Sequence, residues 1–132
     1  MSFGVDRLIA EITALGYESV YKTEVKPEGA TETLSFAIIP DYEVQVGRFA
    51  GRVIALGVPA PPNFPQSVGA SIHVLADPQL LELENVPNVR NIIASPLGPD
   101  WRYWSHNFNW AGAQEGSAAR LLQQINAIFD RA

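Results

Sequence analysis

The chain has 132 residues, of which 47% are hydrophobic and 17% are charged, and its formal net charge is −5 with no cysteine. These values fit one folded domain spanning residues 1–132 and argue against a disordered chain. The 9 Lys and Arg residues form no cluster, which disfavours nucleic acid and anionic membranes as partners, and the lack of cysteine excludes disulfides, thiolate metal sites and cysteine nucleophiles.

The first segment is predicted to be a helix, because its apolar residues recur at intervals of three and four positions. These residues are Val5, Leu8, Ile9, Ile12 and Leu15. Ser2 is a candidate N-cap, and Gly16 is a candidate helix terminator. The sequence therefore predicts an N-terminal helix that ends near Gly16.

Several stretches with strand-like patterns follow the first helix. Alternation or enrichment in strand formers is seen at residues 17–25, 34–39, 42–46, 52–58 and 70–75. Pro40-Asp41 is expected to break the second stretch, and the nearly all-apolar 52–58 stretch is expected to be a central strand. A run of strands flanked by helices predicts an α+β fold with an antiparallel meander of about four strands.

The second half is predicted to be less regular until its last segment. Residues 59–65 contain four prolines and should form an extended connector. A short helix is expected at 78–83, followed by an ordered loop up to about residue 100. The last segment should be a helix with Ser117 as N-cap, Glu115 near its positive end and Arg131 near its negative end. Its apolar stripe consists of Leu121, Leu122, Ile125, Ile128 and Phe129.

All three tryptophans lie between residues 100 and 110. Aromatic side chains either pin a long loop to the core or anchor a binding surface, and both interpretations fit this segment. We expect the segment to divide its rings. At least one of Trp101, Trp104 and Trp110 should be buried, and at least one should stay partly exposed.

Few residues suggest catalysis. Ser105 and His106 are adjacent, so their side chains diverge, and no Gly-x-Ser-x-Gly elbow is present. His73 is predicted to be a structural histidine on the strand face opposite Ile72 and Val74. No metal-binding or phosphate-binding motif is found, and Asp41 with Glu43 is explained equally well by a solvated strand edge. We therefore expect no cofactor and no metal.

Three patches, in their order along the chain, resemble the ubiquitin-conjugating (UBC) superfamily. Pro59 with Phe64-Pro65 is similar to its proline and aromatic-proline element after the third strand. Pro87-Asn88-Val89 resembles its His-Pro-Asn-Val segment, with Val86 in place of the histidine. The stretch from Trp101 to Phe108 resembles the tryptophan and Ser-Arg-His-aromatic pattern of a prokaryotic branch called family E.

The resemblance implies a UBC-like domain without its conjugating chemistry. The catalytic cysteine of the superfamily would fall near Ser95-Pro96-Leu97, and Asn107 occupies the histidine position of the bacterial pattern, with His106 one residue early. An unactivated serine without an adjacent base is a poor nucleophile. We therefore expect a non-catalytic binding module, with a ubiquitin-like protein or its activating enzyme as partner.

The residues expected to bind this partner come from all three patches. They are Trp101, Trp104, His106, Asn107, Phe64 and Asn88. The alternative is a hydrolase-like, non-thiol enzyme that uses His106 with Ser105 or with a nearby acid such as Asp100. A small-molecule sensor is a third possibility. Since no segment reads as a signal peptide or a membrane span, we expect a cytoplasmic protein without a membrane partner.

Overall fold

The computed structural model describes residues 3–86, 90–110 and 116–132, which form two helices and seven strands. The elements are, in chain order, α1 (Gly4–Ala14), β1 (Tyr21–Val25), β2 (Leu34–Glu43), β3 (Val53–Pro59), β4 (Ser71–Leu75), β5 (Glu84–Val86), β6 (Arg90–Ser95), β7 (Gly98–Ser105) and α2 (Ser117–Arg131). Ser2, Glu115 and the Pro87-Asn88-Val89 patch lie outside the described residues. The α+β class is confirmed.

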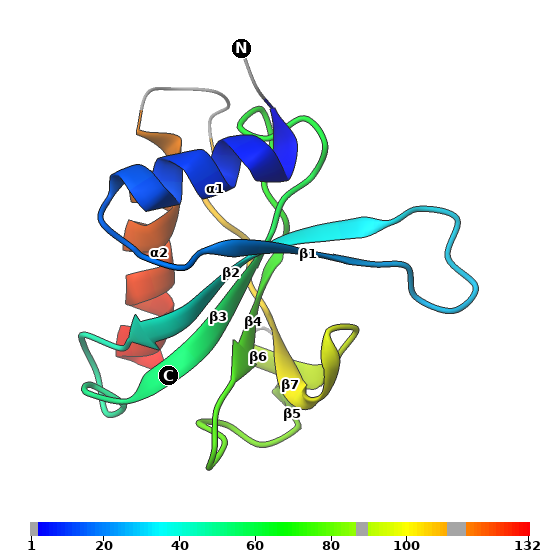
Figure 1. Cartoon of the computed structure of the whole chain (residues 1–132). Helices are drawn as coiled ribbons and strands as arrows, with labels where there is room; N and C mark the ends of the chain where they lie inside the picture. The colour runs from blue at the N-terminus through cyan, green and yellow to red at the C-terminus, as the bar shows by residue number, and fades with distance from the viewer. Residues whose placement is uncertain (1–2, 87–89, 111–115) are drawn as a thin grey trace.

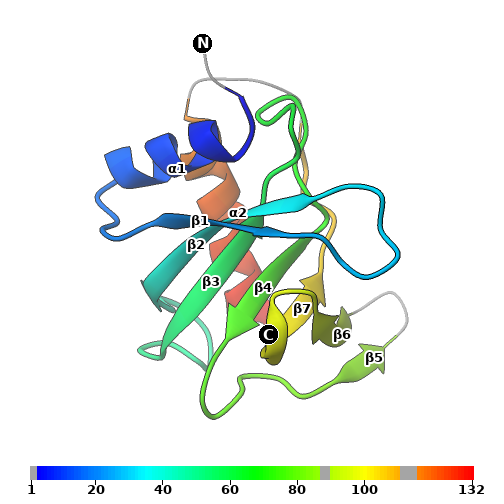
Figure 2. The same cartoon turned by 45° about the vertical axis from the view of Figure 1, so that its right-hand side comes forward.

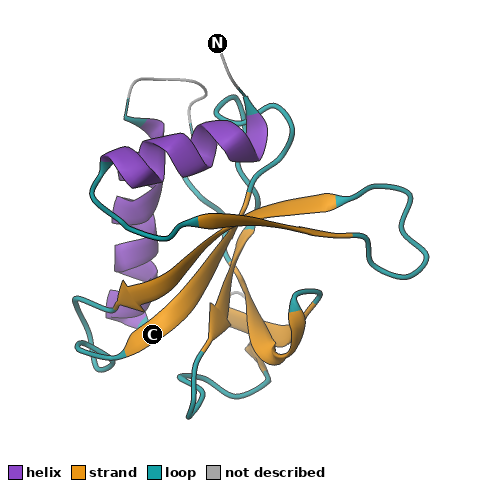
Figure 3. Ribbon diagram, viewed as in Figure 1, coloured by secondary structure: helices purple, strands orange, loops and turns teal. Residues whose placement is uncertain are grey.

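All seven strands belong to one antiparallel sheet with the order β1-β2-β3-β4-β7-β6-β5. Both helices pack on the same face of this twisted sheet, and no helix of the described residues covers the other face, which we call the helix-free face (Figures 1 and 3). The first four strands are neighbours in chain order, whereas β7, β6 and β5 extend the sheet beyond β4 (Figure 2). The expected number of strands was therefore too low.

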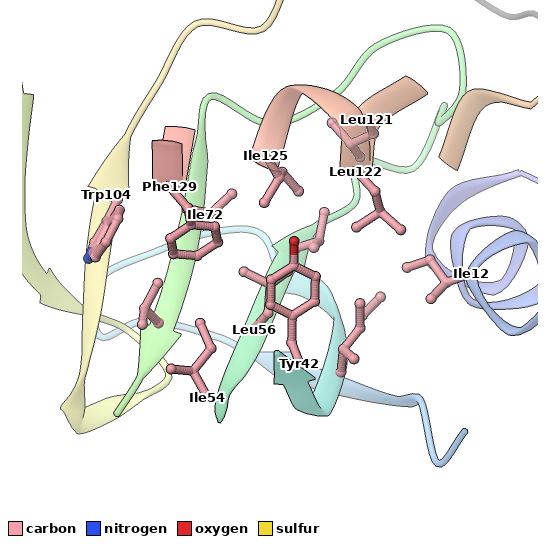
Figure 4. Packing of buried hydrophobic residues seen from close by; sticks show 14 of the residues in the cluster. Ile12, Tyr42, Ile54, Leu56, Ile72, Trp104, Leu121, Leu122, Ile125 and Phe129 are labelled. Carbon is pink, nitrogen blue, oxygen red and sulfur yellow. The ribbon is translucent and has the colours of Figure 1, made fainter. Parts of the chain in front are cut away.

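The main core lies between the helices and the sheet. The α2 stripe packs on alternate residues of the central strands, with Phe129 next to Tyr42 and Trp104 (Figure 4). Of the predicted stripe of α1, Leu8 and Ile12 are completely buried. Burial of such side chains stabilises the fold by about 1.5–3 kcal/mol for each residue. Leu15 lies just beyond the helix and is 47% exposed, so the expected extension of the stripe to this residue was wrong.

The most consequential error of prediction concerns residues 77–105. The short helix expected at 78–83 does not form, and the stretch expected to be a loop contains β5, β6 and the start of β7. These strands pair with each other and with β4, and the 98–105 segment is therefore a strand with rings on both faces. In this stretch, hydrogen-bonded pairing with strands distant in the sequence determines the structure, and the local sequence pattern does not reveal it.

Pro40 and Asp41 bend a strand and do not end it. The β2 strand continues from Leu34 to Glu43, and its register against β3 shifts between Ile39 and Tyr42. A bulge accommodates a proline, which cannot donate a ladder hydrogen bond. The expected break of the strand at this position was therefore wrong, although the proline does coincide with the shift in the β2–β3 register.

The helix ends differ in how well they were predicted. Gly16 follows the C-terminus of α1 with a φ of +104°, and its amide donates to the Thr13 carbonyl, as expected of a terminating glycine. Ser117 is not the N-cap of α2: Gly116 takes that position, and Glu11 of α1 accepts a hydrogen bond from the Ala118 amide at 3.0 Å. A carboxylate from one helix thus stabilises the positive end of the other.

Candidate functional site

Trp101 and Trp104 lie on opposite faces of the sheet. Three positions separate them in β7, and successive side chains of a strand point to opposite faces. Trp104 points to the helices and is 3% exposed, whereas Trp101 is half-buried on the helix-free face. Trp110 is also half-buried, so the expected division of the three rings into buried and partly exposed is confirmed.

The other predicted binding residues are dispersed. Phe64 is completely buried and packs in the main core, where its ring centroid lies 6.3 Å from that of Trp110. His106 is half-buried directly after β7, with its ring against Phe108, and Asn107 is exposed. Asn88 lies outside the described residues. The five predicted residues that the structure describes therefore do not form one contiguous site.

The connection after β7 is held in place by polar contacts. The His106 amide donates to the Ala70 carbonyl at 2.9 Å, and the Trp110 indole Nε1 donates to the Pro65 carbonyl at 2.8 Å. The guanidinium of Arg120 in α2 lies 4.0 Å from the centroid of the Trp110 ring. Trp110 thereby connects the proline-rich segment to α2.

The geometry does not support a hydrolase centred on His106. Within the described ranges, no hydrogen bond joins Ser105 to the His106 ring. Asp100 belongs to the other end of β7, roughly 20 Å away at the rise of an extended strand. Without a base oriented by a third group, Ser105 has no activated hydroxyl.

A pocket of about 180 Å³ lies beside His106, between the end of α2 and the strands β6 and β7. Its walls include Leu81, Ile92, Trp104 and Ile128. Ser105, His106 and Arg131 supply its polar groups. Burial lowers the pKa of His106, and the charge of Arg131 lowers this pKa further, so the imidazole is neutral at pH 7. The pocket therefore brings together two predicted residues, Trp104 and His106.

A second group of polar side chains is buried on the helix-free face. The His73 Nδ1 lies 2.7 Å from the Ser95 Oγ, and the His73 Nε2 lies 3.1 Å from the Ser71 Oγ. The Leu97 amide donates to the same Ser95 oxygen at 3.1 Å, which leaves the Ser95 hydroxyl free to donate to Nδ1. One neutral tautomer of His73, with its proton on Nε2, satisfies all of these contacts.

This polar network, which consists of Ser71, His73 and Ser95, corrects one premise of the sequence interpretation. A histidine does lie next to Ser95, the position where the resemblance places a nucleophile. Burial nevertheless lowers the pKa of His73 to about 4, and a base with so low a pKa is weak at neutral pH. Ser95 itself is only 8% exposed. The prediction of a structural histidine opposite Ile72 and Val74 is confirmed.

The turn between β6 and β7 folds over the centre of the helix-free face. A β-carbon at Gly57 would lie 2.9 Å from the Leu97 Cδ1 and 3.3 Å from the Ile38 Cδ1, so glycine leaves room for the Leu97 side chain. Phe36 and Tyr103 contact the His73 ring edge-on, with centroid distances of 4.8 and 5.3 Å. Together these side chains form a small second core beneath the turn.

Around this second core, the helix-free face exposes large apolar side chains. The strand registers place Tyr21, Leu34, Val53 and Ile93 on this face, and between 41% and 58% of each residue's surface is exposed. Trp101 and Tyr103 lie half-buried on the same face. Aromatic side chains with one exposed side are common anchors of protein interfaces.

Sequence reasoning missed the partners of His73 and the pocket. Ser71 and His73 alternate within one predicted strand, so their shared face could have been inferred. Ser95 joins them only through the pairing of β6 with β7, which has no local signal. Within the parts of the chain that the structure describes, no cluster of residues suitable for a metal ion is present, and no helix is long and apolar enough to cross a membrane.

Comparisons with models of protein families, with curated proteins and with solved structures find no match to this chain.

Proposed function

We propose that this domain is a non-catalytic binding module that docks a protein partner on the helix-free face of its sheet. The observation that carries the proposal is the half-buried Trp101, which lies on a face where four other large apolar residues are at least 41% exposed. Large apolar patches on a protein surface mark interaction sites. The three sequence patches that resemble the UBC superfamily favour a ubiquitin-like protein or its activating enzyme as the partner.

The placement of the described serines beside the two histidines supports the non-catalytic part of the proposal. Ser71 and Ser95 both have the His73 ring within hydrogen-bond reach, but they are only 4% and 8% exposed. The Ser95 oxygen also accepts a hydrogen bond from the Leu97 amide. Ser105 has no such histidine contact among the described residues. A nucleophile must reach the carbonyl that it attacks, and the buried Ser95 cannot do so in this conformation. Its contacts instead stabilise the β6–β7 turn.

Trp101→Ala is expected to weaken partner binding by about thirtyfold or more, because truncating an aromatic anchor costs about 2 kcal/mol or more. The partners to be tested are a ubiquitin-like protein and a matching activating enzyme, each titrated in calorimetry. Phe3→Ala is the matched control, because Phe3 is 47% exposed but precedes α1 on the other side of the sheet.

The expected pattern is loss of affinity for Trp101→Ala with unchanged affinity for Phe3→Ala. If both variants bound the partner as tightly as the parent chain, the proposal that the partner docks on the helix-free face would be contradicted. Failure of both partners to bind the parent chain would contradict the proposed class of partner. The thermal midpoint of each variant shows whether a loss of affinity reflects unfolding.

A further inference from the structure

The pocket beside His106 has an apolar interior formed from four separate segments. Leu81 comes from the connection before β5, Ile92 from β6, Trp104 from β7 and Ile128 from α2. Ile92 and Trp104 are 2% and 3% exposed, so packing in the main core holds this part of the pocket lining in place. An apolar cavity of about 150 Å³ holds a benzene-sized ligand, and this pocket has about 180 Å³.

The polar side of the pocket carries positive charge in a protein that is negative overall. Arg131 and Ala132 both line the pocket, and the Ala132 oxygen accepts a hydrogen bond from the Arg48 Nε at 3.1 Å. No Asp or Glu side chain is among the described residues that line the pocket. The net charge of the whole chain is −5, so the positive side chain of Arg131 gives this pocket a charge opposite to that of the protein as a whole. No hydrogen bond or ion pair holds the Arg131 guanidinium within the described ranges, which leaves its donors available.

Two further groups can bind a polar ligand atom beside Arg131. Ser105 has a hydroxyl, and the neutral imidazole of His106 has one donor and one acceptor nitrogen. The charge of Arg131 reaches the His106 ring, because it contributes to lowering the pKa of that ring. The guanidinium and the imidazole also line the same pocket of about 180 Å³, so one small ligand group can reach both.

We propose that this pocket binds a small apolar carboxylate, with its ring or branched chain on the Ile92–Trp104 wall and its carboxylate at Arg131. A guanidinium matches the planar carboxylate with two parallel donors. The volume limits the ligand to about one six-membered ring with its acid group. This inference is independent of the proposed protein docking, because the pocket opens beside α2 and not on the helix-free face.

The experiment compares benzoate with benzamide, which has nearly the same shape but no charge. Calorimetry and amide NMR shifts of the complete chain are recorded at pH 7. Benzoate is expected to bind about three- to tenfold more tightly than benzamide, with shifts confined to residues around Ile92 and His106. Benzoate should also raise the pKa of His106, because it neutralises the nearby Arg131 charge, whereas benzamide should not raise it.

Arg131→Gln should weaken benzoate binding by about three- to tenfold, since the guanidinium is exposed and its interaction is partly screened by solvent. Lys26→Gln removes an exposed cation of the β1–β2 connection and should change nothing. Leu81→Trp should fill the pocket and abolish binding. Equal binding of benzoate and benzamide, no effect of Arg131→Gln, shifts located elsewhere, or no benzoate binding at about 10 mM would each overturn the proposal.

Discussion

Trp104→Ala is expected to lower the free energy of unfolding by about 3–5 kcal/mol, the usual cost of truncating a buried tryptophan. The Trp104 side chain is 3% exposed, and its ring centroid lies 5.4 Å from that of Phe129 in α2. Its removal would leave a cavity between the sheet and α2. Urea unfolding of the parent chain and the variant, followed by circular dichroism, measures the difference.

Two further variants separate the causes of this effect. Trp104→Phe keeps most of the ring, and the Nε1 that it removes has no hydrogen-bond partner within the described parts of the chain, so it should cost less than about 2 kcal/mol. Trp101→Ala affects a half-buried ring and should cost about 1 kcal/mol. An equal loss of stability for Trp101→Ala and Trp104→Ala would contradict the assignment of one ring to the core and the other to the surface.

Acidification is expected to destabilise the protein through His73. Burial lowers the pKa of His73 to about 4 in the folded state, whereas the unfolded value is near 6.5. Between these values the unfolded chain binds more protons than the folded chain, so stability is complete above pH 6.5 and falls as the pH decreases toward 4. The loss should be about 2 kcal/mol at pH 5 and about 3 kcal/mol below pH 4.

The two histidines of the chain allow a matched comparison. Urea midpoints at pH 7.5 and pH 5.0 should differ less in His73→Gln than in the parent chain, because the variant lacks the group that titrates. His106→Gln should keep most of the difference, since His106 is only partly buried. The same pH dependence in His73→Gln and the parent chain would show that other groups cause it.

The helices could be predicted because local pattern and tertiary packing agree. In α2, Leu121, Leu122, Ile125 and Phe129 have helical spacing and are all buried. The β3 strand was predicted as central because it is apolar on both faces, which fits burial by helices on one face and by the second core on the other. In both cases the hydrophobic effect alone places the element.

The strands β5 to β7 could not be predicted for an equally physical reason. In β7, Trp104 faces the core while Trp101 and Tyr103 face the second core or solvent, so both faces carry aromatic residues and no apolar–polar alternation results. The Ser95 contact to His73 joins residues that are 22 positions apart. The pocket likewise needs Leu81, Ile92 and Arg131 together, and only the folded sheet brings these segments into contact.

We expect the proposed docking to involve no covalent bond between the domain and its partner. Intact-mass spectrometry tests it on the complete chain after incubation with the activating enzyme, the ubiquitin-like protein and ATP. We expect the mass of the chain to stay unchanged, because Ser95 is 8% exposed and its nearest base, His73, has a pKa of about 4. A hydroxylamine-sensitive ester that joins the ubiquitin-like protein to Ser95, and that is lost in Ser95→Ala, would contradict this claim.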